Sequence, residues 1–63
     1  MEPPTVREVI DRLKREGFQE LRCVGDHRHF RKDGRTVTVS GKLSSHVRKG
    51  TWSEIKRQAG WQK

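Results

Sequence analysis

The dipeptide Asp33-Gly34 separates two six-residue segments, His27–Lys32 and Arg35–Ser40, in which apolar and polar side chains alternate. This arrangement predicts a β-hairpin with a two-residue turn, because Asp and Gly tolerate the positive φ angles that such a turn requires. A turn of this length also fixes the register. It pairs Lys32 with Arg35, Phe30 with Val37, Arg28 with Val39, Arg31 with Thr36, His29 with Thr38 and His27 with Ser40.

The register divides the hairpin into two faces, because side chains alternate along each strand. Phe30, Val37 and Val39 share one face, which must pack against the rest of the chain. The opposite face carries His27, His29, Arg31, Thr36, Thr38 and Ser40. We therefore expect this face to stay open to solvent, with two histidines and an arginine side by side.

Two further segments have helical patterns, and both begin with the Thr-x-x-Glu sequence of a capping box. After Thr5 the apolar positions of one helical face are Val6, Val9, Ile10 and Leu13, and Gly17 is suited to end the helix. After Thr51 the corresponding positions are Trp52, Ile55 and Ala59, followed by Gly60. The sequence predicts one helix at each end of the chain.

Residues 19–24 predict a third strand, in which Leu21 and Cys23 alternate with charged neighbours and Cys23 faces the helices. Residues 41–50 are polar and predict a loop. The chain is then a single domain, 1–63, of the α+β class. Its expected architecture is a two-layer α-β-β-β-α sandwich, with both helices on one face of a three-stranded antiparallel sheet, as in double-stranded-RNA-binding domains.

The charge of the chain is distributed unevenly. Residues 1–21 carry four basic and five acidic side chains, whereas residues 22–63 carry eleven basic and three acidic ones. This asymmetry favours a polyanionic partner, nucleic acid above all; the alternative is an ordinary solvated surface. The single cysteine, and the lack of an apolar run of membrane-spanning length or of a signal peptide, predict a cytoplasmic protein.

His27 is the candidate for proton transfer, because histidine titrates near neutral pH. It is suited to take a proton from a ribose 2′-hydroxyl and to return one to the leaving 5′-oxygen. The candidate phosphate-binding cations are Arg28, Arg31, Lys32, Arg35 and Lys42. The alternatives are a histidine that merely faces solvent and a zinc site of Cys23, His27, His29 and His46. No CxxC or HxxxH pattern supports zinc, so we expect no metal.

Four pieces of the sequence carry a family resemblance: Leu13–Phe18, Gly25–Phe30, Asp33–Val39, and Lys49–Ile55 with Gln58–Gly60. Together they resemble HicA, the mRNA interferase of bacterial and archaeal type II toxin–antitoxin systems. The resemblance extends from Val6 to Trp61.

This resemblance implies a double-stranded-RNA-binding-like fold that cleaves mRNA without a metal or other cofactor. It also implies a HicB-like antitoxin that covers the catalytic histidine. The family histidine follows a Gly-Ser pair and precedes an aromatic residue by three positions, which matches His27 and Phe30. Asp26 stands where the family has Ser, and Lys49 where it has Pro. A carboxylate at position 26 favours the imidazolium form of its neighbour, and it can also repel phosphate or cap the turn.

Two hypotheses compete with the toxin ribonuclease. One is a non-catalytic RNA-binding module of the same fold, which uses shape and phosphate contacts. The other is a protein whose only role is complex formation. Growth arrest on expression separates the ribonuclease from both, and salt-sensitive RNA binding separates the two from each other.

Overall fold

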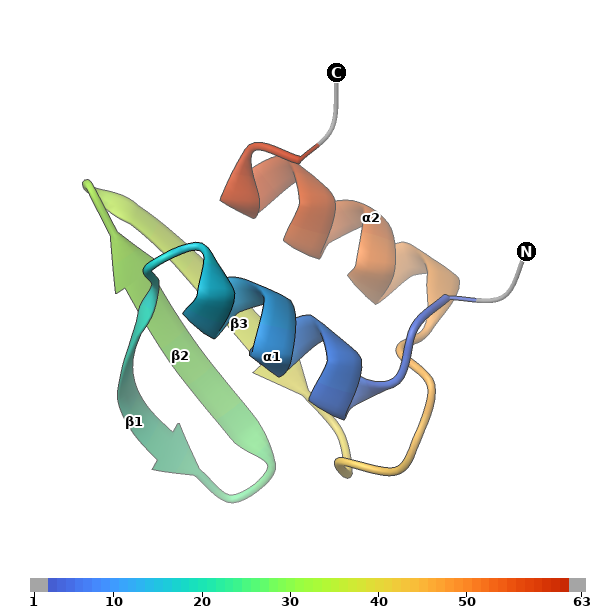
Figure 1. Cartoon of the computed structure of the whole chain (residues 1–63). Helices are drawn as coiled ribbons and strands as arrows, with labels where there is room; N and C mark the ends of the chain where they lie inside the picture. Colours follow the sequence, from blue (N-terminus) through green and yellow to red (C-terminus); the bar gives the residue numbers. More distant parts are fainter. Residues whose placement is uncertain (1–2, 62–63) are drawn as a thin grey trace.

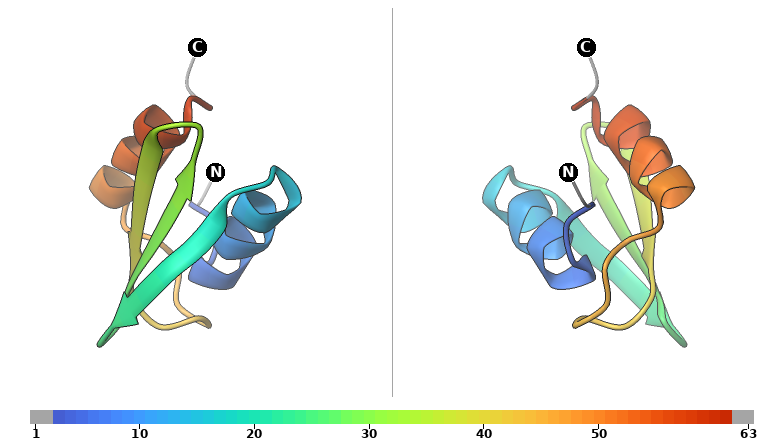
Figure 2. Two further views of the ribbon diagram at one scale, coloured as in Figure 1. Left: turned by 90° about the vertical axis from the view of Figure 1, so that its left-hand side faces the viewer. Right: turned by 90° about the vertical axis from the view of Figure 1, so that its right-hand side faces the viewer.

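The computed structural model describes residues 3–61 as two helices and one sheet. The elements follow in the order α1 (Val6–Arg15), β1 (Gln19–Val24), β2 (His27–Lys32), β3 (Arg35–Ser40) and α2 (Lys49–Ala59) (Figure 1). The strands form an antiparallel sheet in the order β1-β2-β3. Both helices cover the same face of this sheet (Figure 2). The predicted two-layer α+β sandwich is confirmed, and no helix of the described residues has the length and apolar character to cross a membrane.

The hairpin of β2 and β3 has the predicted register in all six pairs, from His27–Ser40 to Lys32–Arg35. Its turn residues, Asp33 and Gly34, have φ angles of 49° and 81°. Positive φ at both central residues matches the twist of a two-residue hairpin. The turn therefore places His27 at the far end of the hairpin from Asp33.

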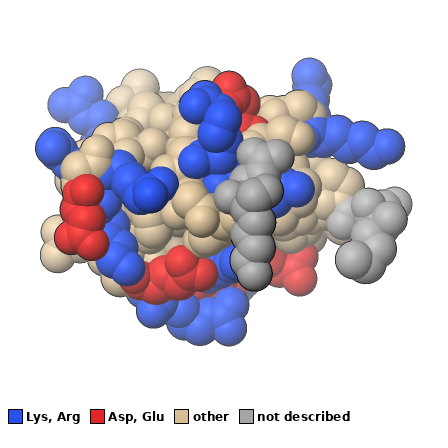
Figure 3. Space-filling model, turned by 90° about the horizontal axis from the view of Figure 1, so that it is seen from above, with Lys and Arg blue, Asp and Glu red and all other residues tan. Residues whose placement is uncertain are grey.

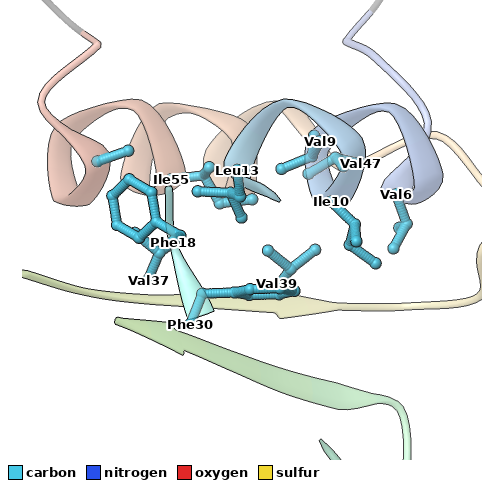
Figure 4. Packing of buried hydrophobic residues seen from close by; sticks show 11 residues of the cluster. Val6, Val9, Ile10, Leu13, Phe18, Phe30, Val37, Val39, Val47 and Ile55 are labelled. Atoms are coloured by element: carbon cyan, nitrogen blue, oxygen red, sulfur yellow. The ribbon is translucent and has the colours of Figure 1, made fainter. Parts of the chain in front are cut away.

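The core lies between the sheet and the helices. Phe30, Val37 and Val39 extend from the sheet toward the helices (Figure 4) and are fully buried. The other core residues are Val6, Val9, Ile10, Leu13, Phe18, Val47, Ile55 and Ala59, with Trp52 and Trp61 packed against them. Val47 belongs to the segment predicted as a polar loop, and its burial fixes that segment against the core.

Helix α1 begins with the predicted capping box. The Glu8 N–H donates to Thr5 Oγ1 at 3.2 Å, and the Thr5 N–H donates to Glu8 Oε1 at 2.8 Å. The Thr5 backbone N–H, followed by its hydroxyl, holds the pKa of Glu8 below 4.5. The helix ends before Gly17, which has a φ of 97° and lets the Phe18 N–H donate to the Leu13 carbonyl.

The capping box predicted at Thr51 and Glu54 is wrong. Helix α2 begins at Lys49, its N-cap is Arg48, and no side chain caps it. The reason lies just before the helix, where Val47 is buried and its N–H donates to the Pro4 carbonyl at 2.9 Å. This anchor fixes the chain ahead of Arg48, whose carbonyl accepts the first helical hydrogen bond, from Trp52. Thr51 therefore lies inside the first turn.

The predicted alternation in β1 is also wrong. The pairing with β2 shifts between Glu20 and Arg22, which leaves Leu21 at a bulge. All six residues of β1 are exposed. Cys23 pairs with Arg28, which pairs with Val39, so it lies on the predicted face of the sheet but is exposed there. β1 is an edge strand that extends past the cover of the helices, so alternation there does not indicate burial.

The two helices are also joined near their C-terminal ends. Trp61 Nε1 donates to Glu16 Oε1 at 2.7 Å, and this hydrogen bond is the main reason that the pKa of Glu16 lies below its ordinary value. The Arg12 guanidinium lies over the Trp61 ring, 4.0 Å from its centroid. Gly60, with a φ of 79°, ends α2, and Trp61 packs back onto α1.

Candidate active site at the end of the hairpin

A cleft of about 530 Å³ lies at the end of the hairpin that is distant from the Asp33-Gly34 turn. It is formed by the β1–β2 turn, the end of β3, the loop that follows β3, and the first turn of α2. The lining residues are Asp26, His27, Ser40, Gly41, Lys42, Ser45, His46, Val47, Arg48 and Thr51. Segments far apart in the sequence therefore converge on His27.

Backbone hydrogen bonds hold these segments together. The Gly41 N–H donates to the Asp26 carbonyl at 3.1 Å, which ties the end of β3 to the β1–β2 turn. On the other side of the loop, the Val6 N–H donates to the Ser45 carbonyl and the Arg7 N–H to the Leu43 carbonyl. The N-terminus of α1 thus fixes the loop that carries Lys42, so the walls of the cleft are pre-formed.

His27 lies in the wall of this cleft with 58% of its side chain exposed. Its Nδ1 is 3.1 Å from Asp26 Oδ1. His29, two residues along the same face, is half-buried, and its Nδ1 is 3.1 Å from Thr38 Oγ1. His29 does not line the cleft. The two histidines predicted on the open face therefore differ in access to a ligand.

The five predicted phosphate-binding cations lie in different places. Lys42 lines the cleft with His27, and Arg31 is exposed on the open face of the sheet. Arg28 lies on the opposite face of the sheet from His27, and its Nη1 is 3.4 Å from Glu20 Oε2. Lys32 donates to the Glu16 carbonyl, and the Arg35 guanidinium lies against Gly60 near the hairpin turn. The structure brings Lys42 to His27 and leaves Arg28, Lys32 and Arg35 away from the cleft.

The cleft also contains residues that the sequence did not indicate for phosphate binding. Arg48 lines it from the N-cap position of α2, and Ser45 and Thr51 contribute hydroxyl groups. His46, considered only as a zinc ligand, lines it too, with Nδ1 2.8 Å from the Pro3 carbonyl oxygen. No local motif marks these positions, because their proximity to His27 arises from the folding of the loop.

Among the described residues that line the cleft, cations outnumber carboxylates. Asp26 is the one carboxylate of that set, and neither Lys42 nor Arg48 forms an ion pair with any residue from 3 to 61. The side of the molecule seen from the top of Figure 1 is different, since acidic side chains lie among the basic ones there (Figure 3). An anion in the cleft thus meets uncompensated positive charge.

Comparison with known families identifies the chain. The family model for the HicA toxin of bacterial toxin-antitoxin systems matches residues 6–61. The chain belongs to the HicA toxin family. It is therefore the toxin of a toxin–antitoxin pair, and an antitoxin is its partner. No curated protein and no solved structure matches the chain.

The matched range includes every described residue that lines the cleft of this HicA-family chain. It also includes Cys23, His27, His29 and His46, the residues considered as zinc ligands. Over the described part of the chain, no three His, Cys, Asp or Glu side chains gather closely enough to hold a metal ion. Of the residues that the structure describes, the cleft offers two imidazoles, two cations, one carboxylate and several hydroxyls.

Proposed function

We propose that this HicA-family toxin is an endoribonuclease that cleaves mRNA, with His27 as general acid and base. His27 takes the proton of a ribose 2′-hydroxyl, and the 2′-oxygen attacks the adjacent phosphorus. The bond from phosphorus to the 5′-oxygen breaks, and that oxygen leaves with a proton returned by the imidazolium. The observation that carries the proposal is the position of His27, exposed in a cleft with two unpaired cations.

Lys42 and Arg48 are the residues suited to hold the scissile phosphate. Both line the cleft with His27, and charge-assisted hydrogen bonds from such groups stabilise the negative charge of the transition state. Arg31, exposed on the same face as His27, is placed for a neighbouring phosphate. Arg28, Lys32 and Arg35, which already have contacts within the protein, contribute less to RNA binding.

The decisive experiment compares His27→Ala with His29→Ala. General acid–base catalysis is typically worth about 10²–10⁴-fold in rate, so His27→Ala should abolish RNA cleavage and growth arrest. His29 lies outside the cleft, and its variant should retain substantial activity. Both proteins should give the amide spectrum of a folded domain, and cleavage by the unsubstituted toxin should persist in a chelator. Unchanged cleavage by His27→Ala would favour the non-catalytic RNA-binding module.

RNA binding should weaken steeply with salt. Each phosphate that the protein neutralises on a single strand contributes about −0.7 to the slope of log K against log salt, so four contacts give roughly −3. His27→Ala should bind nearly as well as the unsubstituted toxin, whereas Lys42→Ala should reduce the slope. A flat salt dependence would contradict the proposed phosphate contacts and favour a role in complex formation alone.

We further infer that the antitoxin is HicB-like and covers His27 with an acidic surface. The open face of the sheet carries Arg22, Arg31, His27 and His29, and a complementary surface favours fast and specific association. Binding should protect the amides of residues 27–40 from hydrogen exchange. Protection confined to α1 would show that the antitoxin inhibits the toxin from another side.

A further inference from the structure

The two edges of the sheet differ in what covers them. At the β3 edge, the Thr38 N–H donates to Gln58 Oε1 of α2 at 3.2 Å, so a helix side chain occupies a main-chain group there. At the β1 edge, no group from residues 3–61 outside the sheet forms a hydrogen bond with the main chain of Gln19–Val24. β1 therefore presents unpaired N–H and C=O groups along its outer side (Figure 1).

This open edge also carries apolar side chains. Natural proteins usually keep an uncovered edge strand short, charged or distorted, because it can pair with another extended chain. β1 has a bulge at Leu21, yet it is six residues long and exposed throughout. Leu21 and Val24 are 56% and 57% exposed. Of the three exposed large apolar side chains among residues 3–61, two thus lie on this one strand.

A hollow of about 340 Å³ lies beside the first half of β1. The described residues that line it are Gly17, Gln19, Leu21, Arg31, Lys32 and Asp33. Arg31 forms no ion pair with any residue from 3 to 61, and neither does Arg22, which shares the open face of the sheet with it. A carboxylate side chain beside Leu21 can therefore meet an unpaired guanidinium.

Charge decides which partner fits this edge. Two copies of the toxin bring together net charges of +7 each, and the bulge further opposes the pairing of β1 with itself. RNA supplies negative charge but has no amide main chain to pair with a strand. An acidic protein segment supplies both, and a HicA-family toxin has an antitoxin as its partner.

We propose that the antitoxin adds an extended acidic segment to β1 as a fourth strand, with one of its carboxylate side chains in the hollow beside Leu21. Main-chain hydrogen bonds supply affinity in such an arrangement, and side-chain pockets supply specificity. The added strand continues the sheet whose open face carries His27, so it anchors the antitoxin next to the surface that it covers. The inference rests on the antitoxin part of the proposed function and not on RNA cleavage.

The strand pairing is tested by hydrogen exchange and NMR on the full-length toxin, free and in complex with the antitoxin encoded beside it. The outward amides of β1 should exchange on the order of tenfold or more slowly in the complex. They should also show nuclear Overhauser effects to main-chain protons of the antitoxin, whereas the Thr38 amide, held by Gln58, should not.

Three results would overturn the proposal. Protection confined to residues 27–40, with no main-chain contacts from β1, would leave the antitoxin over His27 but remove the added strand. Protection of β1 in concentrated toxin alone would make a second copy the occupant. Protection of β1 by RNA alone would assign the edge to RNA.

A pair of variants tests the hollow. Leu21→Asp places a carboxylate where that of the antitoxin is proposed to bind, so like-charge repulsion should weaken antitoxin binding by about tenfold or more. Ser53→Asp, exposed on α2, makes the same change in net charge and should bind within about twofold of the unsubstituted toxin. Both positions are exposed, so both variants should give the amide spectrum of a folded domain.

Equal losses in the two variants would show that overall charge determines the affinity, which would overturn the docking site at β1. Unchanged binding by Leu21→Asp would overturn it as well. An active His27→Ala variant would contradict the proposed ribonuclease mechanism and would leave these binding results intact.

Discussion

The N-termini of the two helices share the sequence Thr-x-x-Glu, but only the N-terminus of α1 is capped by it. At α1, Thr5 and Glu8 cap each other, and loop carbonyls accept from Val6 and Arg7. At α2, no side chain provides a cap, and no acceptor among residues 3–61 receives a hydrogen bond from the Lys49, Gly50 or Thr51 N–H. The capped N-terminus of α1 belongs to the scaffold, whereas the uncapped N-terminus of α2 contributes to the cleft.

The difference shows that a capping motif acts only where the core fixes the start of the helix. Val6, fully buried, directly follows Thr5, so the helix begins where the motif predicts. Before α2 the buried residue is Val47, four positions ahead of Thr51, and Glu54 binds Arg57 instead, at 2.8 Å. Local sequence rules are expected to fail most often at functional sites. The Thr-x-x-Glu motif of α2 does not form a cap, and this N-terminus lines the cleft.

The largest effect should come from Val47→Ala, which removes the anchor of the uncapped helix. Full burial of a valine side chain contributes roughly 1.5–3 kcal/mol, and Val47 is 3% exposed. The melting temperature should fall by about 4–8 °C for each kcal/mol lost. Leu43→Ala, in the same loop but 42% exposed, is the control and should cost less than about 0.5 kcal/mol. Equal losses would mean that Val47 does not determine where α2 begins.

Thr5→Ala and Thr51→Ala compare the two motifs directly. Loss of an N-cap costs about 1 kcal/mol, so Thr5→Ala should lower the melting temperature by several degrees. Thr51 lies within the first turn of α2 and caps nothing, and alanine is the better helix former. Thr51→Ala should therefore lie within about 0.5 kcal/mol of the unsubstituted protein. A comparable loss at both positions would contradict the observed start of α2.

A cap introduced at α2 should stabilise the protein and impair the toxin. Arg48 has the extended backbone of an N-cap, with φ −67° and ψ 149°, so Arg48→Ser should add a capping hydrogen bond worth about 0.5–1 kcal/mol. The same change removes a cation from the cleft and should weaken RNA binding. Lys42→Ser removes a cleft cation without creating a cap, so it should weaken binding with no gain in stability. Stabilisation of both variants would show that charge repulsion, and not the missing cap, is responsible.

The parts of the fold that the sequence predicted are those determined by neighbouring residues. Asp33 and Gly34 define the turn, and the turn defines the whole register and the open face that carries His27. The bulge at Leu21 and the burial of Val47 depend instead on tertiary packing, which a local pattern does not contain. The same distinction applies to the candidate site. The hairpin register and the family motif predicted the position of His27, whereas Arg48 reaches the cleft only because α1 holds the preceding loop in place.

The smallest expected effect is a difference between the two helix N-termini in how their contribution to stability changes at low pH. Hydrogen bonds from Thr5, its backbone N–H first, hold the pKa of Glu8 below 4.5, and α2 has no acidic residue in its first turn. Because the folded pKa lies below the unfolded one, the stability that Glu8 contributes is complete above pH 4.5 and is lost as the pH falls through the folded pKa. Glu8→Gln, which does not titrate, should melt below the unsubstituted protein at about pH 6, and this difference should close as the pH falls through the folded pKa of Glu8. The Thr5 amide proton should shift with the same midpoint, since it donates to the titrating carboxylate. A difference in melting temperature that persisted unchanged after the Thr5 amide proton had completed its shift would show that the ionised carboxylate does not cap α1.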